Sequence, residues 1–127
     1  MDTANVRYLV DDVPAAVDFY TKQLEFTVEF DAAPAIAAVT RGSLRLLLSG
    51  PRSSGARAMS DGRRPKPGGW NRVQIIVDDL EREVARLRAA GIRFRNDIVT
   101  GPGGRQTLLE DPAGNPVELF TPADREG

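Results

Sequence analysis

Residues 6–13 read Val6-Arg7-Tyr8-Leu9-Val10-Asp11-Asp12-Val13, and residues 73–80 repeat the pattern as Val73-Gln74-Ile75-Ile76-Val77-Asp78-Asp79-Leu80. The offset between the two copies is constant at 67 positions, from Val6 to Val73 and from Val13 to Leu80. Self-similarity at a fixed spacing is typical of a duplicated structural unit. Each copy is an apolar strand ending in Asp-Asp, and its second aspartate, Asp12 or Asp79, is placed as the N-cap of a helix.

After each Asp-Asp pair the sequence predicts one helix and three further strands. The helices span about residues 14–24 and 80–90, and Gly91 is the expected stop of the second. Short apolar segments bounded by turn residues predict strands at about 26–31, 35–41, 43–49, 93–98, 104–110 and 116–121. We expect an α+β fold of two βαβββ modules in tandem, about 4–50 and 70–122, within a single domain. The residues between them, about 50–69, are rich in Gly, Pro, Ser and Arg and are interpreted as a plain linker or as a flap over a site.

The composition excludes several kinds of partner. The chain has 127 residues, of which 41% are hydrophobic and 28% charged, as expected of one globular domain. No apolar run approaches the roughly 18 residues of a membrane-spanning helix. The net charge of -1 does not favour nucleic-acid binding. We therefore expect a cytoplasmic protein with neither a membrane nor a nucleic-acid partner, and the absence of cysteine agrees with that compartment.

Histidine and cysteine are both absent from the sequence. Without cysteine the chain forms no disulfide, thiolate nucleophile or zinc–sulfur site. Without histidine it cannot build a Ser-His-Asp triad or an iron site of two histidines and a carboxylate. Two missing residue types thus remove several classes of enzyme.

Strand alternation divides the strand residues between two faces, because successive side chains of a strand point to opposite sides. The face toward the helices is predicted to hold Val6, Tyr8, Val10, Leu46, Leu48, Val73, Ile75, Val77, Val117 and Leu119. The opposite face is predicted to hold Asn5, Arg7, Leu9, Arg45, Leu47, Arg72, Gln74, Ile76, Glu118 and Phe120. This second set mixes apolar side chains with a few polar ones, which is typical of a ligand pocket.

Two segments carry a family resemblance. The first contains Asp18-Phe19-Tyr20 and Leu24-Glu25-Phe26 after its Asp-Asp pair, and the second ends in Asp111-Pro112-Ala113-Gly114-Asn115-Pro116-Val117-Glu118-Leu119. Together with the repeat, they make nearly the whole chain resemble the vicinal oxygen chelate superfamily, which includes glyoxalase I, bleomycin resistance proteins and extradiol dioxygenases. The resemblance implies that each module is a curved mixed sheet with a helix on its convex face, and that the modules form a ligand cup.

The resemblance also implies where a metal would be bound, since family members hold a divalent metal with residues from the first and last strands of each module. The matching positions are Asn5 and Arg72 on the first strands, and Leu47 and Glu118 on the last strands. Glu118 is a good ligand, whereas Asn5 offers only a weak neutral oxygen. Leu47 offers no donor, and the fixed charge of Arg72 repels a cation. We therefore expect neither a metal nor another cofactor, and an Arg72–Glu118 pair in this place.

Some family members, such as the bleomycin resistance proteins, sequester a toxic natural product as homodimers in which both chains line each groove. By this resemblance we expect a homodimeric, non-catalytic binding protein of the antibiotic self-resistance type. Its expected ligand is neutral or weakly charged, and aromatic or polycyclic. The candidate ligand-binding residues are Trp70, Arg72, Gln74, Asn5, Arg7, Leu47, Glu118, Phe120 and Phe30. Trp70 is the first choice for stacking, and a place in the core or at the dimer interface is its alternative.

Three alternatives remain open on the sequence. The first is a metal-independent enzyme of the glyoxalase or dioxygenase fold, such as an isomerase, cyclase, lyase, hydrolase or dioxygenase-like enzyme, that uses Glu118 as its base. The second is a metal enzyme whose site is completed by Glu118, Asn5 and water. The third is a structural or interaction module whose cup is filled by its own side chains.

Overall fold

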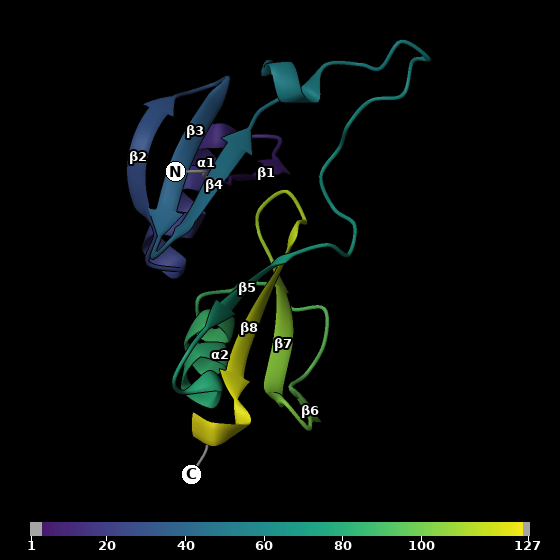
Figure 1. Ribbon diagram of the computed structural model, residues 1–127. Coiled ribbons are helices and arrows are strands. Elements are labelled where there is room, and N and C mark those ends of the chain that lie inside the picture. Colours follow the sequence, from purple (N-terminus) through teal and green to yellow (C-terminus); the bar gives the residue numbers. More distant parts are fainter. Residues whose placement is uncertain (1–3, 126–127) are drawn as a thin grey trace. The chain divides into compact units, whose positions relative to one another are not determined.

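The computed structural model describes residues 4–125, which form two four-stranded mixed sheets, each with one α-helix (Figure 1). The chain divides into two compact units. The first unit holds the residues up to Gly68 together with Pro112–Asn115, and the second holds Gly69–Asp111 and the residues from Pro116 onward. The α+β fold of two βαβββ modules is therefore confirmed.

The first sheet is built from the N-terminal half of the chain. Its elements are β1 (Val6–Leu9), α1 (Val13–Gln23), β2 (Thr27–Ala32), β3 (Ile36–Arg41) and β4 (Leu44–Ser49), followed by the short 3-10 helix η1 (Ser54–Ala56). The strand order is β1-β4-β3-β2. β1 runs parallel to β4, and the other neighbours are antiparallel.

The second sheet repeats this topology. Its elements are β5 (Val73–Ile76), α2 (Leu80–Ala89), β6 (Val99–Gly101), β7 (Gly104–Glu110), β8 (Pro116–Pro122) and the 3-10 helix η2 (Ala123–Arg125). The strand order is β5-β8-β7-β6, with β5 parallel to β8. The equivalent strands of the two sheets thus pair in the same order, as the repeat predicts.

Both helices begin at the aspartates that the sequence marks as caps. Asp12 Oδ1 accepts a hydrogen bond from the Ala15 amide at 3.1 Å, and Asp79 Oδ1 accepts one from the Arg82 amide at 3.2 Å. These contacts satisfy amides that the first turn of a helix leaves without a partner. Gly91 follows α2 with a φ of 82°, in the left-handed region that glycine adopts without strain. Neither helix within residues 4–125 is long and apolar enough to cross a membrane.

Each sheet buries the face that its helix covers. α1 packs on β2, β3 and β4, and α2 packs on β8. The buried residues that alternation assigned to this side are Tyr8, Val10, Leu46, Leu48, Val73, Ile75, Val117 and Leu119. Val77 is only half-buried, and the prediction of a buried Val6 is wrong: it is 37% exposed because it opens an edge strand. The face of each sheet opposite the helix is called the open face below.

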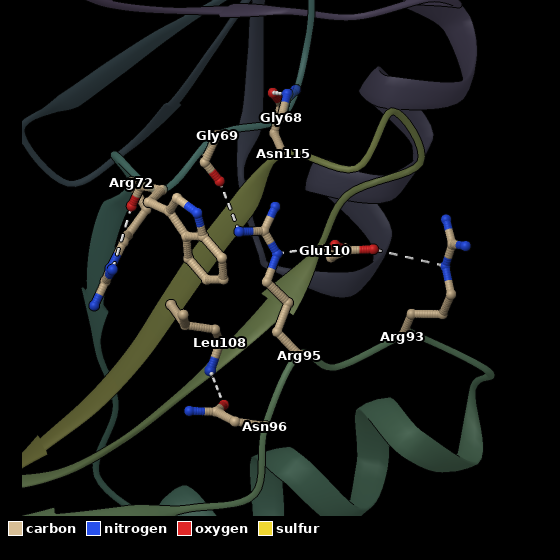
Figure 2. Close-up of polar contacts among 10 residues, drawn as sticks. Gly68, Gly69, Arg72, Arg93, Arg95, Asn96, Leu108, Glu110 and Asn115 are labelled. Carbon is tan, nitrogen blue, oxygen red and sulfur yellow. Dashed lines mark hydrogen bonds and ion pairs between the residues drawn. The ribbon is translucent and has the colours of Figure 1, made fainter.

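The strand predicted at about residues 93–98 is absent, and this prediction is wrong. Phe94 makes only an isolated bridge with Leu109, and the edge strand β6 forms at Val99–Gly101. The cause is Asn96, whose side-chain Oδ1 accepts a hydrogen bond from the Leu108 amide at 2.9 Å (Figure 2). A side chain thereby takes the place of a backbone carbonyl and interrupts the ladder.

The turn between β7 and β8 belongs to the first unit, and Asn115 connects it there to two backbone groups. Its Oδ1 accepts a hydrogen bond from the Gly68 amide at 2.8 Å, and its Nδ2 donates one to the Leu9 carbonyl at 2.7 Å. Asn115 itself is 4% exposed. One amide side chain thus satisfies a donor and an acceptor from two separate segments.

Candidate functional site

A row of side chains crosses the open face of the second sheet at Glu118. The register places Glu118 of β8 opposite Gln74 of β5 on one side and opposite Leu108 of β7 on the other. Residues paired across a sheet project to the same face, so these three side chains are neighbours. The next row along the strands holds Ile76, Phe120 and Gln106.

The carboxylate of Glu118 is buried and is held by two neighbouring side chains. Only 6% of its side chain is exposed. Arg72 approaches Glu118 Oε1 with Nε at 3.0 Å and Nη2 at 2.9 Å, and Gln74 Nε2 donates to Oε2 at 2.6 Å. The predicted pairing of Arg72 with Glu118 is present. Both carboxylate oxygens already accept hydrogen bonds and the side chain is buried, so a metal ion or a substrate proton would have to compete with these partners for Glu118.

Trp70 lies just before β5, and arginine side chains contact both its backbone carbonyl and its indole ring. Arg72 Nη1 donates a hydrogen bond to the Trp70 carbonyl at 3.2 Å. The guanidinium carbon of Arg95 lies 4.6 Å from the centroid of the indole ring, which is cation–π geometry. Trp70 is nevertheless 68% exposed, so the alternative that places it in the core is wrong. A fixed, exposed ring offers a stacking surface at a low cost in side-chain entropy.

Arg95 is itself fixed by several groups of the second unit (Figure 2). Its Nε donates to Glu110 Oε2 at 2.9 Å, and its Nη1 donates to the Gly69 carbonyl at 2.6 Å. Its backbone amide donates to the Leu108 carbonyl at 2.8 Å. Arg93 Nε lies 3.8 Å from Glu110 Oε1, so this carboxylate faces two arginines. Hydrogen bonds therefore fix the position of the Arg95 guanidinium next to the Trp70 ring.

Sequence reasoning did not single out Arg95 or Glu110. The alternation of side chains that placed Glu118 of β8 on the open face could also have placed Glu110 of β7 there. Thr107 and Leu109 of β7 are buried, at 1% and 0% exposure, so Glu110 falls on the opposite side. The position of Arg95 beside Glu110 depends on the interrupted strand, which the sequence pattern does not reveal.

The open face of the first sheet carries a second row. The register aligns Arg7 of β1 with Leu47 of β4, Leu47 with Ala38 of β3, and Ala38 with Phe30 of β2. Leu47 is half-buried and Phe30 is 41% exposed. Arg7 Nη1 donates a hydrogen bond to the hydroxyl of the buried Ser49 at 2.9 Å. This row therefore has the cationic Arg7 at one end and the exposed Phe30 at the other.

A hollow of about 600 Å³ lies beside this row in the first unit. It is lined by Ala4, Asn5, Glu29, Thr40, Gly42, Ser43, Leu44 and Arg45. Arg45 Nη2 is 2.7 Å from Glu29 Oε1, which neutralises both charges. Of the predicted site residues, Asn5 lines this hollow.

The nine predicted ligand-binding residues divide between the two units. The first unit holds Asn5, Arg7, Leu47 and Phe30, and the second holds Trp70, Arg72, Gln74, Glu118 and Phe120. Their role as ligand contacts stays a prediction.

The four positions that the resemblance assigns to metal ligands do not fit a divalent cation. Leu47 has no donor atom, and Asn5 offers a neutral amide. Arg72 is cationic and occupies Oε1 of Glu118. Between residues 4 and 125, no three side chains of the His, Cys, Asp or Glu types come together as metal ligands.

Comparison with known proteins gives one family and many structural relatives. The profile of the Glyoxalase/Bleomycin resistance protein/Dioxygenase superfamily matches residues 3–119. No curated protein sequence matches the chain at a significant level.

Three solved structures show the likeness in fold. Lactoylglutathione lyase from Agrobacterium tumefaciens is 23% identical, with a TM-score of 0.73 over 94% of this chain and 92% of that one. A superfamily member from Sphaerobacter thermophilus DSM 20745 is 26% identical, with a TM-score of 0.72 over 95% and 98%. TnmS3, an antibiotic binding protein from Streptomyces sp. CB03234, is 23% identical, with a TM-score of 0.68 over 97% and 99%.

Proposed function

Because the chain belongs to the Glyoxalase/Bleomycin resistance protein/Dioxygenase superfamily, we propose that it is a non-catalytic binding protein that sequesters an aromatic or polycyclic small molecule. One observation carries the proposal. On the open face of the second sheet, Arg72 and Gln74 engage the carboxylate of Glu118, and a fixed, exposed indole stands beside them. The first feature disfavours chemistry at Glu118, and the second favours stacking.

The contacts of Glu118 disfavour reactivity of its carboxylate. A general base needs a free lone pair directed at the substrate, and a metal ligand needs an oxygen that faces the cation. Oε1 of Glu118 faces two nitrogen atoms of Arg72, and Oε2 accepts a hydrogen bond from Gln74, so a further partner would reach only the remaining lone pair of Oε2 in a buried side chain. The neighbouring family positions supply no second carboxylate. This side-chain set therefore supports binding better than turnover.

The charges around Trp70 are already paired, Arg72 with Glu118 and Arg95 with Glu110. An apolar ring that covers this surface would leave neither ion without its partner, so the cost of desolvation is lower than for an unpaired charge. Stacking on Trp70 adds about 0.5–1.5 kcal/mol beyond the burial of apolar area. A flat, mostly neutral aromatic molecule fits these properties.

The fold itself is compatible with such a role. TnmS3 has this fold and is an antibiotic binding protein, whereas lactoylglutathione lyase has the same fold and is an enzyme. The fold alone does not choose between binding and catalysis. The engaged carboxylate of Glu118 and the exposed ring of Trp70 favour binding over catalysis. The homodimer that the resemblance implies stays a prediction, and sedimentation equilibrium tests it.

The test is a binding screen against anthraquinones, other polycyclic natural products and flavins, read by the fluorescence of Trp70. We expect saturable quenching, and recovery of the compound chemically unchanged after prolonged incubation. Replacing Trp70 by leucine should weaken binding about three- to tenfold by calorimetry, which corresponds to the loss of one stacking contact.

The matched control for this screen is Val99→Ala, which removes another exposed apolar side chain of the same unit, 49% exposed on β6. We expect its affinity to equal that of the wild type. Conversion of a bound compound, abolished by Glu118→Gln, would replace the proposal with the enzyme alternative.

A further inference from the structure

Arginines on the open faces are mostly neutralised by carboxylates. Ion pairs with N···O distances of 2.7–2.9 Å join Arg45 to Glu29, Arg72 to Glu118 and Arg95 to Glu110. Arg7 differs, because no carboxylate of residues 4–125 lies within ion-pair distance of it. Its guanidinium donates instead to the neutral hydroxyl of Ser49. Among the described residues, Arg7 is therefore a positive charge on an open face without an ionic partner.

Two neighbours hold the Arg7 side chain in place. The hydrogen bond from its Nη1 to Ser49 fixes one edge of the guanidinium. The 3-10 helix η1 packs so closely against the same side chain that a Cβ atom on Gly55 would overlap Nη1, Cδ and Cζ of Arg7. Glycine at position 55 thus lets the backbone contact the arginine. Within the described part of the chain, Nε and Nη2 make no hydrogen bond, so these donors remain for a ligand.

The surroundings of Arg7 have the composition of a binding surface. Its row continues over the half-buried Leu47 and the buried Ala38 to Phe30, which is 41% exposed. Three strand spacings separate Arg7 from Phe30, a distance of about 14 Å. That is about the length of a fused aromatic system with one substituent. A guanidinium at one end of an apolar strip suits a molecule with an oxyanion at one end of a flat ring system.

We propose that Arg7 binds the acidic substituent of an aromatic ligand, so that the ligand class for this face is an aromatic acid with a carboxylate or a similar oxyanion. This inference rests on the proposed function, because it assigns the open face of the first unit to an aromatic small molecule that carries an acid group. The acid group pairs with Nε and Nη2 of Arg7, and the ring system covers Leu47 toward Phe30.

The experiment compares two probes of equal shape, 2-naphthoate and the neutral 2-naphthamide. Amide-resolved NMR titration of the full-length protein measures both dissociation constants, even in the millimolar range. We expect 2-naphthoate to bind about tenfold more tightly, the effect of one charge-assisted hydrogen-bonded pair. The resonances of β1 and β4 should shift with the acid.

Variants assign the preference to Arg7. Arg7→Gln should abolish the preference for the acid and leave 2-naphthamide binding unchanged, while Arg7→Lys should keep part of it. Arg82→Gln removes the same charge from the surface of α2 and should keep all of it. Unchanged amide spectra outside the neighbourhood of Arg7 verify that each variant is folded.

The outcomes separate this inference from the proposed function. Equal affinity for the two probes, or an acid preference that survives in Arg7→Gln, overturns the inference while aromatic binding stands. If neither probe shifts an open-face resonance or changes Trp70 fluorescence, both proposals fail for aromatic ligands.

Discussion

Replacing Arg95 by glutamine should release the Trp70 ring without unfolding the second unit. The substitution removes the cation that lies 4.6 Å from the ring centroid, and with it the ion pair to Glu110 at 2.9 Å and the hydrogen bond to the Gly69 carbonyl. The cation–π contact is worth about 0.5–1 kcal/mol at an exposed site. The hydrogen bond and the ion pair are worth about 1 kcal/mol each. Glu110 keeps Arg93 at 3.8 Å, which reduces the loss.

These contributions predict that the free energy of unfolding falls by about 2 kcal/mol. The assay is urea unfolding followed by far-ultraviolet circular dichroism. A double-mutant cycle with Trp70→Leu isolates the ring contact, and its coupling energy should be about 0.5–1 kcal/mol. Acrylamide should quench Trp70 more strongly in the Arg95→Gln variant, because the ring moves more freely in solvent.

The matched control is Arg86→Gln, which breaks an exposed ion pair with Glu83 on α2 at 3.3 Å. It should cost less than about 0.5 kcal/mol and leave the quenching of Trp70 unchanged. A coupling energy of zero between Arg95 and Trp70, with quenching equal to that of the wild type, would refute the claim that Arg95 places the ring.

Three further substitutions test other contacts. Arg72→Gln leaves the buried Glu118 carboxylate with one partner and should lower the free energy of unfolding by about 2–3 kcal/mol. Adding Glu118→Gln should recover most of this stability in urea unfolding, and a double variant as unstable as Arg72→Gln would show that the buried charge is not the cause. The hydrogen bond from Arg105 lowers the pKa of Glu81 from its ordinary value of 4.5, so the stability it adds is present above that value and is lost as the pH falls through the folded-state pKa. Arg105→Gln should therefore flatten the acid limb of the stability profile as the pH falls below the ordinary pKa of 4.5, and an unaltered limb would contradict this. Asn115→Ala removes the side chain that bonds the Gly68 amide and the Leu9 carbonyl, and thermal unfolding should report a loss of about 2 kcal/mol in the free energy of unfolding. An unchanged unfolding midpoint would mean that water replaces the side chain.

The features that the sequence predicted correctly depend on local physics. The caps at Asp12 and Asp79 follow from the need of a helix for acceptors at its first turn, and the open faces follow from the two-residue period of strands. The pairing of Arg72 with Glu118 followed once the alternation and the family positions were combined.

Other features depend on contacts between segments that are distant in sequence. Asn96 interrupts a strand with its side chain, and no pattern of hydrophobicity encodes that substitution. The position of Arg95 under Trp70 follows from this interruption. The isolation of the Arg7 charge is similar, because it depends on which carboxylates the folded sheet brings near.

The pairing of Glu118 with Arg72 and Gln74, in place of a metal, is tested most directly by the metal content of the protein. The protein would be purified from cells grown with added iron, manganese, nickel and zinc, and analysed by inductively coupled plasma mass spectrometry. We expect no divalent metal in stoichiometric amount, with the same residual content in the Glu118→Gln variant. One equivalent of metal per chain, lost in Glu118→Gln, would show that the carboxylate faces a cation and that the binding-only interpretation is wrong.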